Sequence, residues 1–306
     1  MFGRRYDGRR VKHMDPVVQL TPHLMPMRCD AQVFLDHEVE YEPLMRYIAE
    51  KSRAGVKITF MEVLVAAYVR GVSQVPEVNR FIMNKQFYNR TQLTVAFTML
   101  LDTPDGSLEE TAVKIHFDPS DTLLDVSARI KETIANNRKP ENANMALKLA
   151  SFLMSAPLLP NLVVGIVRLL DRYGICPKMI LEASPFHTAM FITNMASIGM
   201  HKVYHHIYNF GTTSLFLSLG TPEREYGVDA SGKVVRKCTL PVGVTADERV
   251  CGGAVYAQLF AVMKKCLRNP VLLEQPPETV KYNEGAEYHH PKPPKLAGSQ
   301  EQAVRA

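Results

Sequence analysis

Side chains capable of acid–base and nucleophilic chemistry gather in the stretch Val242 to Ala254 (VGVTADERVCGGA). Asp247, Glu248 and Arg249 stand together, and Cys251 follows two residues later. A carboxylate can take up a proton and an arginine can bind an anion, whereas a cysteine is a nucleophile only as a thiolate. An ordinary connection between a strand and a helix can carry the same residues. Spacing alone therefore leaves a functional and a structural interpretation open.

The elements on either side of this stretch predict how it is positioned. Cys238 to Thr245 is rich in apolar and β-forming residues, which predicts a strand arriving from the core. Gly252 and Gly253 then open a helix whose apolar residues recur at helical spacing as far as Leu267. The chemically active residues are therefore expected at the end of a strand, immediately before a helix.

Strands and helices alternate through the rest of the chain without a regular strand–helix–strand rhythm. Strand patterns are strongest in Thr91–Leu101 and Thr188–Asn194, and Asn84-Lys85 is the turn of a predicted hairpin. Thr59–Val72 has few polar positions and predicts a nearly buried helix. Neither a GxGxxG motif nor a Walker-type loop is present. The predicted class is α/β with a mixed sheet in one main domain.

Composition and charge limit the class of protein. The chain has 306 residues, of which 46% are hydrophobic and 22% charged, as in an ordinary soluble globular protein. The net charge is +5, and much of it belongs to an N-terminal basic run made of Arg4, Arg5, Arg9, Arg10 and Lys12. We expect a solvated arm here, with contact to anionic partners as the alternative. No basic stripe interleaved with aromatic residues indicates a nucleic-acid partner.

Cysteine usage and local composition predict the compartment and the domain limits. The five cysteines are odd in number and show no CxxC pairing, which favours a reducing, cytoplasmic location and argues against a disulfide framework or a zinc site. No apolar secretory signal opens the sequence. We expect residues 1–27 to form a basic, proline-rich arm and residues 28–272 to form the main domain. Residues 273–306 predict a flexible tail, because their composition cannot bury enough apolar surface.

One segment requires comparison with a membrane span. Ala150 to Leu170 (ASFLMSAPLLPNLVVGIVRLL) is almost uncharged, but Pro157 and Pro160 interrupt it. The apolar run after the prolines is about ten residues long, and a spanning helix needs roughly 20. We expect a buried, oligomer-contacting or interfacial helix. Contact of residues 150–170 with a membrane surface or a long acyl chain is a further alternative.

Three segments resemble the catalytic domain of the dihydrolipoyl acyltransferases of 2-oxo-acid dehydrogenase complexes and the related chloramphenicol acetyltransferase. Leu64–Asn79 (LVAAYVRGVSQVPEVN) resembles the apolar helix of that family, which ends in Pro-x-x-Asn. Phe191–Gly199 (FITNMASIG) resembles its strand and glycine turn with a hydroxyl residue. Asp247–Ala254 (DERVCGGA) stands where the family has Asp-His-Arg-x-x-Asp-Gly-Ala. The order and separation of the three segments agree, and the resemblance spans roughly residues 20–272.

The resemblance implies a chloramphenicol-acetyltransferase-like two-layer α/β sandwich with a mixed sheet. It also implies a homotrimer, or a larger cage, with one active site at each subunit interface. Acyl transfer would use coenzyme A or acyl-coenzyme A and an acceptor thiol, hydroxyl or amine, and no lipoyl segment is recognised in this chain. Thr193 matches the hydroxyl residue that hydrogen-bonds the oxyanion. Asp247 and Arg249 match the first Asp and the Arg of the motif.

Two departures from the family pattern bear on catalysis. Glu248 stands where the family has its catalytic histidine, and Gly252 stands where it has a structural aspartate. An alkyl thiol titrates near ~8.5 and a free glutamate near ~4.3, so proton transfer from thiol to glutamate begins roughly 5–6 kcal/mol uphill. Glu248 can serve as the base only if it is dry and unpaired. The sequence therefore predicts an acyltransferase with an altered or lost base, or a non-catalytic trimeric scaffold or binding module.

Other candidate residues have structural alternatives. His205 and His206 follow the Thr193 strand, but a histidine pair in a loop favours a surface or packing role over catalysis. Cys251 follows an apolar valine, which favours a core cysteine over a nucleophile. His116 lies on a predicted strand and has no acidic partner nearby in the sequence.

Overall fold

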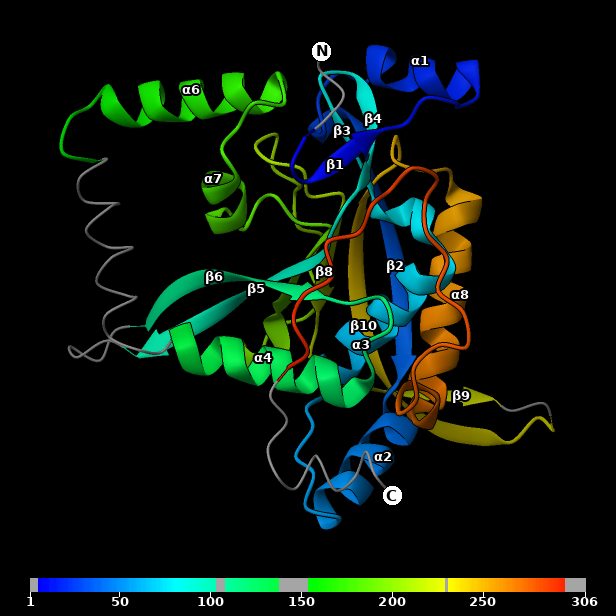
Figure 1. Ribbon diagram of the computed structural model, residues 1–306. Coiled ribbons are helices and arrows are strands. Elements are labelled where there is room, and N and C mark those ends of the chain that lie inside the picture. Colours follow the sequence, from blue (N-terminus) through cyan, green and yellow to red (C-terminus); the bar gives the residue numbers. More distant parts are fainter. Residues whose placement is uncertain (1–4, 103–107, 138–153, 229–230, 295–306) are drawn as a thin grey trace.

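The main sheet is mixed, as the sequence predicts. The computed structural model describes residues 5–102, 108–137, 154–228 and 231–294 (Figure 1). The strands of the main sheet are β2 (Gln32–Glu40), β5 (Leu93–Asp102), β6 (Leu108–Phe117), β7 (Met190–Asn194), β8 (Leu215–Leu219), β9 (Glu223–Val228) and β10 (Val234–Asp247). Their order is β2–β10–β8–β7–β5–β6, with β9 paired to β10. β7 is parallel to both of its neighbours, and the other pairs are antiparallel.

Helices and one face of this sheet enclose the core. The helices are α2 (Tyr41–Arg53), α3 (Phe60–Gln74), α4 (Leu123–Asn137) and α8 (Gly253–Arg268). α3 packs against α8 and is buried along most of its length, as its apolar sequence predicts. It begins with a capping box in which Thr59 and Glu62 satisfy each other's backbone N–H groups. Alternate strand residues, among them Ile192, Leu217 and Val244, point into this core.

The opposite face of the sheet is covered by irregular chain. Phe191 and Phe216 project from it and pack with Ile207, which belongs to the segment after β7. That segment crosses the sheet closely, because a Cβ added at Gly243 would lie 2.5 Å from the carbonyl oxygen of Val203. A glycine at this strand position therefore allows the backbone to approach.

The N-terminal arm contains regular secondary structure. It contains β1 (Gly8–Arg10) and α1 (Pro16–Leu24). β1 joins the hairpin of β3 (Arg80–Met83) and β4 (Gln86–Arg90), whose turn residues Asn84 and Lys85 have positive φ angles of 50° and 60°, as the hairpin prediction requires. Arg4 lies outside the described residues, while Arg5 is buried. The solvated-arm prediction is therefore wrong for Arg5, whose guanidinium pairs with Asp7 and Asp171.

The apolar segment forms an exposed helix at one end of the molecule. Its described part contains α6 (Leu159–Arg172), and α7 (Lys178–Ala183) follows (Figure 1). Residues 150–153 lie outside the described residues. Of the α6 residues only Asp171 is buried, so the alternative of a buried helix is wrong within one chain. Among the described residues, no helix is long and apolar enough to cross a membrane.

Much of the C-terminal segment is ordered against the body. Asn283 is 6% exposed and donates to the carbonyl oxygen of Pro76 at 2.6 Å. The backbone N–H of Lys281 donates to Ser73, and that of His289 donates to Thr91. The prediction of a flexible tail is therefore wrong for residues 276–294, and residues 295–306 lie outside the described part. Composition alone did not predict this order, because the segment is held by specific hydrogen bonds and by Tyr288, which packs against the core.

Four short 3-10 helices complete the described elements, at Cys29–Ala31, Pro76–Asn79, Met195–Ile198 and Pro270–Leu273.

Candidate functional site

The stretch rich in active side chains is a turn between β10 and α8. β10 ends at Asp247, whose backbone N–H donates to Ser214 at 2.9 Å. The backbone N–H of Glu248 donates to the carbonyl oxygen of Ala31 at 3.0 Å. Gly252 is the N-cap of α8 and has an extended conformation. The predicted order of strand, turn and helix is therefore present.

A buried ion cluster supports this turn. Asp247 is 1% exposed, and its two carboxylate oxygens accept from Arg249 Nε at 2.8 Å and Nη2 at 2.7 Å. A second guanidinium, that of Arg28, lies 3.5 Å from the same carboxylate. Arg249 also donates to the carbonyl oxygen of Met25 at 2.8 Å. Asp247 and Arg249 therefore tie the end of β10 to the arm, and their charged groups face each other rather than an open site.

Arg28 extends the cluster toward the segment that follows β7. Its Nη1 donates to Tyr208 at 2.7 Å and its Nη2 to Gly211 at 3.2 Å. Burial lowers the pKa of Arg28, an effect that the charge of Asp247 opposes. The carboxylate of Asp247 thus balances the charge of two buried guanidinium groups, and these buried ion pairs stabilise the turn.

Glu248 differs from its neighbours because its side chain is exposed. Within the described part of the chain, no hydrogen bond or ion pair holds its carboxylate. Arg249, which could have neutralised it, is already occupied by Asp247. Within one chain, the carboxylate of Glu248 is therefore unpaired but exposed to solvent, which meets only one of the two conditions for service as a base.

The two residues before α8 have opposite surroundings. A Cβ added at Gly252 would meet no atom within 4 Å, so this position has room for a side chain. Cys251 is buried in the main core, and burial raises the pKa of its thiol to about 12. A thiol in that state stays protonated at neutral pH. The prediction of a core cysteine at this position is confirmed.

Thr193 lies at the end of β7 and is half-buried. Among the described residues, its hydroxyl contacts only the sulfur of Met195, at 3.8 Å. The hydroxyl can therefore donate a hydrogen bond to another group. Strand register places Thr193 level with Ser218 and, through it, with Gly243. Asp247 lies four residues farther along β10, which is about 13 Å at the usual strand rise. Thr193 and Glu248 of one chain are therefore not neighbours.

The histidine candidates have structural partners. The ring of His205 stacks on Phe216 with a centroid distance of 4.2 Å and an interplanar angle of 2°, which confirms a packing role. His116 Nε2 lies 2.8 Å from the carboxylate of Glu182 on α7. This acidic partner is distant in the sequence, and only the fold brings the two residues together.

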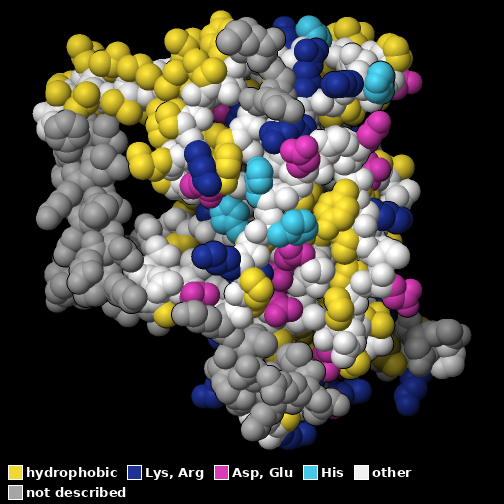
Figure 2. Space-filling view, in the orientation of Figure 1, with side chains coloured by type: hydrophobic (Ala, Val, Ile, Leu, Met, Phe, Trp, Pro, Cys, Tyr) yellow, Lys and Arg dark blue, Asp and Glu magenta, His cyan; other side chains and the backbone are white. Residues whose placement is uncertain are grey.

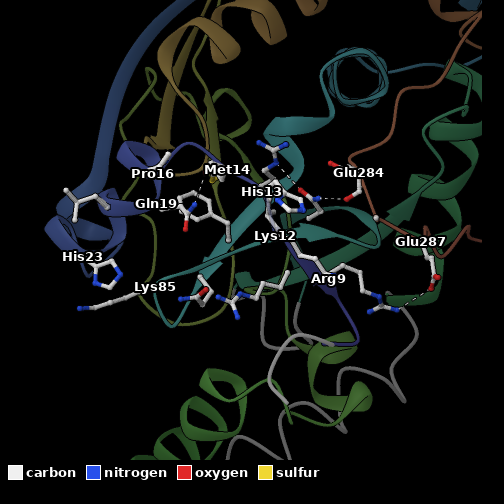
Figure 3. A pocket seen from close by; sticks show the side chains of 18 residues that line it. Arg9, Lys12, His13, Met14, Pro16, Gln19, His23, Lys85, Glu284 and Glu287 are labelled. Atoms are coloured by element: carbon white, nitrogen blue, oxygen red, sulfur yellow. Dashed lines mark hydrogen bonds and ion pairs between the residues drawn. The ribbon is translucent and has the colours of Figure 1, made fainter.

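The structure contains a basic cavity that sequence reasoning did not predict. It has a volume of about 1280 Å³ and lies between the arm, the β3–β4 hairpin and residues 284–287 (Figure 3). Its cationic lining residues are Arg9, Arg10, Lys12, Arg80 and Lys85, and its acidic ones are Glu284 and Glu287. The N-terminal basic run was the available signal, because three of the five cations belong to it.

Arg80 is half-buried in the wall of this cavity. Its guanidinium donates to two neutral amide oxygens, those of Asn89 at 2.9 Å and Asn283 at 3.1 Å. Burial lowers the pKa of Arg80, and the charge of Glu77 opposes the effect. Arg9 has an acidic neighbour, Glu287, at 3.7 Å. The cavity wall therefore carries more positive than negative charge.

Comparison with known proteins identifies the fold. No protein-family model matches the sequence, and no curated protein does. Among solved structures, the dihydrolipoamide acetyltransferase of Azotobacter vinelandii matches with a TM-score of 0.53 and 15% identity, covering 86% of this chain and 93% of that one. The chain has the fold of an acyltransferase catalytic core. The chloramphenicol-acetyltransferase-like α/β sandwich predicted from three short segments is thereby confirmed.

Two further structures share this fold. The cubic core of a pyruvate dehydrogenase multienzyme complex matches with a TM-score of 0.52 and 16% identity, over 86% of this chain and 93% of that one. The truncated catalytic core of a 2-oxoacid dehydrogenase complex from Thermoplasma acidophilum matches with a TM-score of 0.50 and 16% identity, over 85% and 98%. Because each match covers nearly all of the compared chain, the likeness extends over a whole core domain.

Proposed function

We propose that this protein is an oligomeric binding module that keeps the acyltransferase fold and has lost the base for acyl transfer to a thiol. The supporting observation is the turn after β10. Its buried pair Asp247–Arg249 is intact, whereas Glu248 is exposed and Gly252 has no side chain. An exposed carboxylate is a poor base for a thiol, because the transfer begins roughly 5–6 kcal/mol uphill.

Residue spacing supports the comparison of this turn with an active enzyme. In the Azotobacter vinelandii enzyme a serine, a histidine and an asparagine have roles in the catalytic mechanism. The asparagine follows the histidine by four residues, and the serine precedes the histidine by 52. Here Gly252 follows Glu248 by four residues, and Thr193 precedes it by 55. The hydroxyl position is filled, while the other two positions have changed chemistry.

A site that combines Thr193 with Glu248 needs two copies of the chain. Thr193 ends β7 and Glu248 follows β10; these strands are separated by β8 and the two residues lie at opposite ends of them, so the residues can meet only across an interface. One of the matched structures is a cubic core of a multienzyme complex. We therefore propose a homotrimer, with a larger cage as the next level of assembly, and a ligand site for coenzyme A or an acyl thioester between copies.

A second candidate function is acyl transfer with a different acceptor. Thr193 favours it, because among the described residues its hydroxyl has only a weak sulfur contact, and it could donate to an oxyanion instead. An amine that is already neutral needs no base to attack a thioester, so this reaction would tolerate Glu248. The donor would still be an acyl-coenzyme A.

A comparison of three proteins tests these proposals: the wild type, Glu248→Gln and the double variant Glu248→His/Gly252→Asp. Each is examined for oligomeric mass by light scattering, for coenzyme A binding by calorimetry, and for acetyl transfer from acetyl-coenzyme A to dihydrolipoamide and to an amine. We expect equal masses, equal binding, and transfer to the thiol only by the double variant. Thiol transfer by the wild type that Glu248→Gln abolishes would overturn the proposal. Amine transfer by wild type and Glu248→Gln alike would establish the second candidate.

A further inference from the structure

One end of the molecule combines exposed apolar helices with exposed cations. We call it the α1–α6 end and define it by α1, α6, the hairpin tip Asn84-Lys85 and the arm residues Arg10 and Lys12. In Figure 1 both helices lie at the same end, away from α2. Figure 2 shows hydrophobic side chains over both helices, with lysine, arginine and histidine side chains between them. The surface is thus apolar at its two sides and basic in the middle.

α6 presents an apolar stripe that the body of the protein leaves uncovered. Its members follow one another at intervals of three or four residues, so they share one face of the helix. The exposed fractions are 78% for Leu158, 60% for Leu162, 48% for Ile166, 56% for Leu169 and 42% for Tyr173. Arg168 and Arg172 border the stripe and are exposed. Positive charge beside an apolar stripe is typical of a helix that lies at a membrane surface.

α1 presents a second stripe with the same character. Val17 is 75% exposed, Leu20 is 52% exposed and Leu24 is 70% exposed. They recur at intervals of three and four residues, so they also share one face. Other residues hold the arm on the body: β1 pairs with β4, and Val18 of α1 packs against the core. The three exposed side chains of the stripe are therefore not needed for that contact.

Contacts between named residues show that the two helices belong to one surface. Arg172 Nε donates to Asn84 Oδ1 at 3.0 Å, which joins the end of α6 to the hairpin tip. Lys85, the next residue, lines the basic cavity together with Gln19 and Leu20 of α1. The cavity therefore lies between the two apolar stripes.

The cations of this end have few acidic partners. Arg10, Lys12, Lys85 and Arg168 form no ion pair with any residue of the described ranges. Glu284 and Glu287 line the cavity, and Glu287 pairs with Arg9. Asp171 of α6 is buried and occupied by Arg5 and His187. The surface that binds the α1–α6 end should therefore be anionic and should also accept apolar side chains.

We propose that the α1–α6 end binds the surface of a membrane that contains anionic lipids. The two apolar stripes would enter the boundary between headgroups and acyl chains, and the lysines and arginines would reach the lipid phosphates. A second copy of the chain satisfies the charges less well, because a symmetric contact would bring the same cations face to face. The helices are too short to span, so the protein would lie on the membrane. This inference does not depend on Glu248 or on acyl transfer.

Vesicle flotation of the full chain tests the proposal without any variant. We expect the protein to float with vesicles of phosphatidylcholine and phosphatidylserine, to float poorly with phosphatidylcholine alone, and to dissociate at high salt. Absence of flotation with the anionic vesicles would overturn the proposal. Equal flotation with both vesicle types would also overturn it, because the cations would then contribute nothing.

Matched variants test which residues are responsible. Each lysine near an anionic surface strengthens partitioning about fivefold, so Lys12→Gln/Lys85→Gln should bind about 25-fold more weakly. Leu162→Glu/Leu169→Glu should abolish flotation. The controls are Arg236→Gln/Lys237→Gln and Tyr226→Glu/Val234→Glu on the exposed β9–β10 hairpin, and these should bind like the wild type. Circular dichroism checks that each variant is folded.

Light scattering separates the membrane from a second copy as the partner. If Leu162→Glu/Leu169→Glu lowers the oligomeric mass while the wild type fails to float, the α1–α6 end is an interface between copies and the proposal is wrong. If the mass is unchanged and only flotation is lost, the lipid surface is supported.

Discussion

The carboxylate of Asp247 accepts from both Nε and Nη2 of Arg249, at 2.8 and 2.7 Å. These residues flank Glu248, yet they face away from it into the protein. The turn therefore separates two roles that the sequence places side by side. Asp247 and Arg249 maintain its shape, and Glu248 alone presents a charged group to the exterior.

Breaking this pair should destabilise the protein far more than changing Glu248. Asp247→Asn leaves the guanidinium groups of Arg249 and Arg28 buried without their counter-charge, and we expect a loss of about 3–5 kcal/mol in the free energy of unfolding. Glu248→Gln should stay within about 0.5 kcal/mol, because its side chain is exposed. Urea unfolding of both variants measures the difference. Equal losses would show that Glu248 is a structural residue.

The cysteines should differ sharply in reactivity. Cys29 is exposed, whereas Cys176 and Cys251 are buried, and burial raises the pKa of their thiols to about 11 and about 12. Cys251 should then form on the order of a thousandfold less thiolate than an unperturbed cysteine near 8.5. Alkylation by iodoacetamide in native buffer, followed by peptide mass spectrometry, should label Cys29 first. Rapid labelling of Cys251 in the folded protein would instead identify a reactive thiol.

The C-terminal segment should contribute to stability despite its polar composition. Asn283→Ala removes a hydrogen bond to Pro76 and leaves the guanidinium of Arg80 with one fewer partner. We expect a cost of about 1–3 kcal/mol, because buried polar groups lose their partners. Glu278→Ala, in an exposed part of the same segment, is the matched control and should change stability by less than about 0.5 kcal/mol. If both variants unfold like the wild type, the segment is not held as the structure indicates.

The core elements could be predicted because their signals are local. The apolar run of α3 and the β-forming residues of β10 each specify an element by composition and period. The position of the turn at Glu248 followed from the same local pattern, together with the resemblance. Sequence reasoning failed where distant residues meet. His116 contacts Glu182, and Arg5 pairs with Asp171, only after the chain has folded.

The membrane-facing stripe of α6 shows a different limit of sequence reasoning. Its apolar composition was visible, but composition is the same for a buried helix and an exposed one. Leu162 is 60% exposed, and no residue of α6 belongs to the main core. The choice between a buried helix and an oligomer-contacting or interfacial one therefore depended on the fold and not on the segment.

Stability should fall as the pH is lowered below neutrality, and two histidines should account for much of the change. Burial lowers the pKa of His116 and of His37 in the folded protein. The folded state then binds fewer protons than the unfolded state once the pH falls to the unfolded histidine value near ~6.5. Unfolding is favoured below that value, and above it both states are neutral at these positions. Urea unfolding at pH values on either side of 6.5 measures the slope.

Variants distinguish this effect from general acid destabilisation. His116→Gln cannot take up a proton and should flatten the dependence of unfolding free energy on pH, and combination with His37→Gln should flatten it further. Glu182, the partner of His116, does not contribute near pH 6.5, because its pKa lies below the usual glutamate value. Burial raises this pKa, but the hydrogen bond from Gln92 and the charges of His116 and Lys114 outweigh burial and lower it. A slope that persists in the double histidine variant would mean that carboxylates, rather than these imidazoles, couple folding to pH.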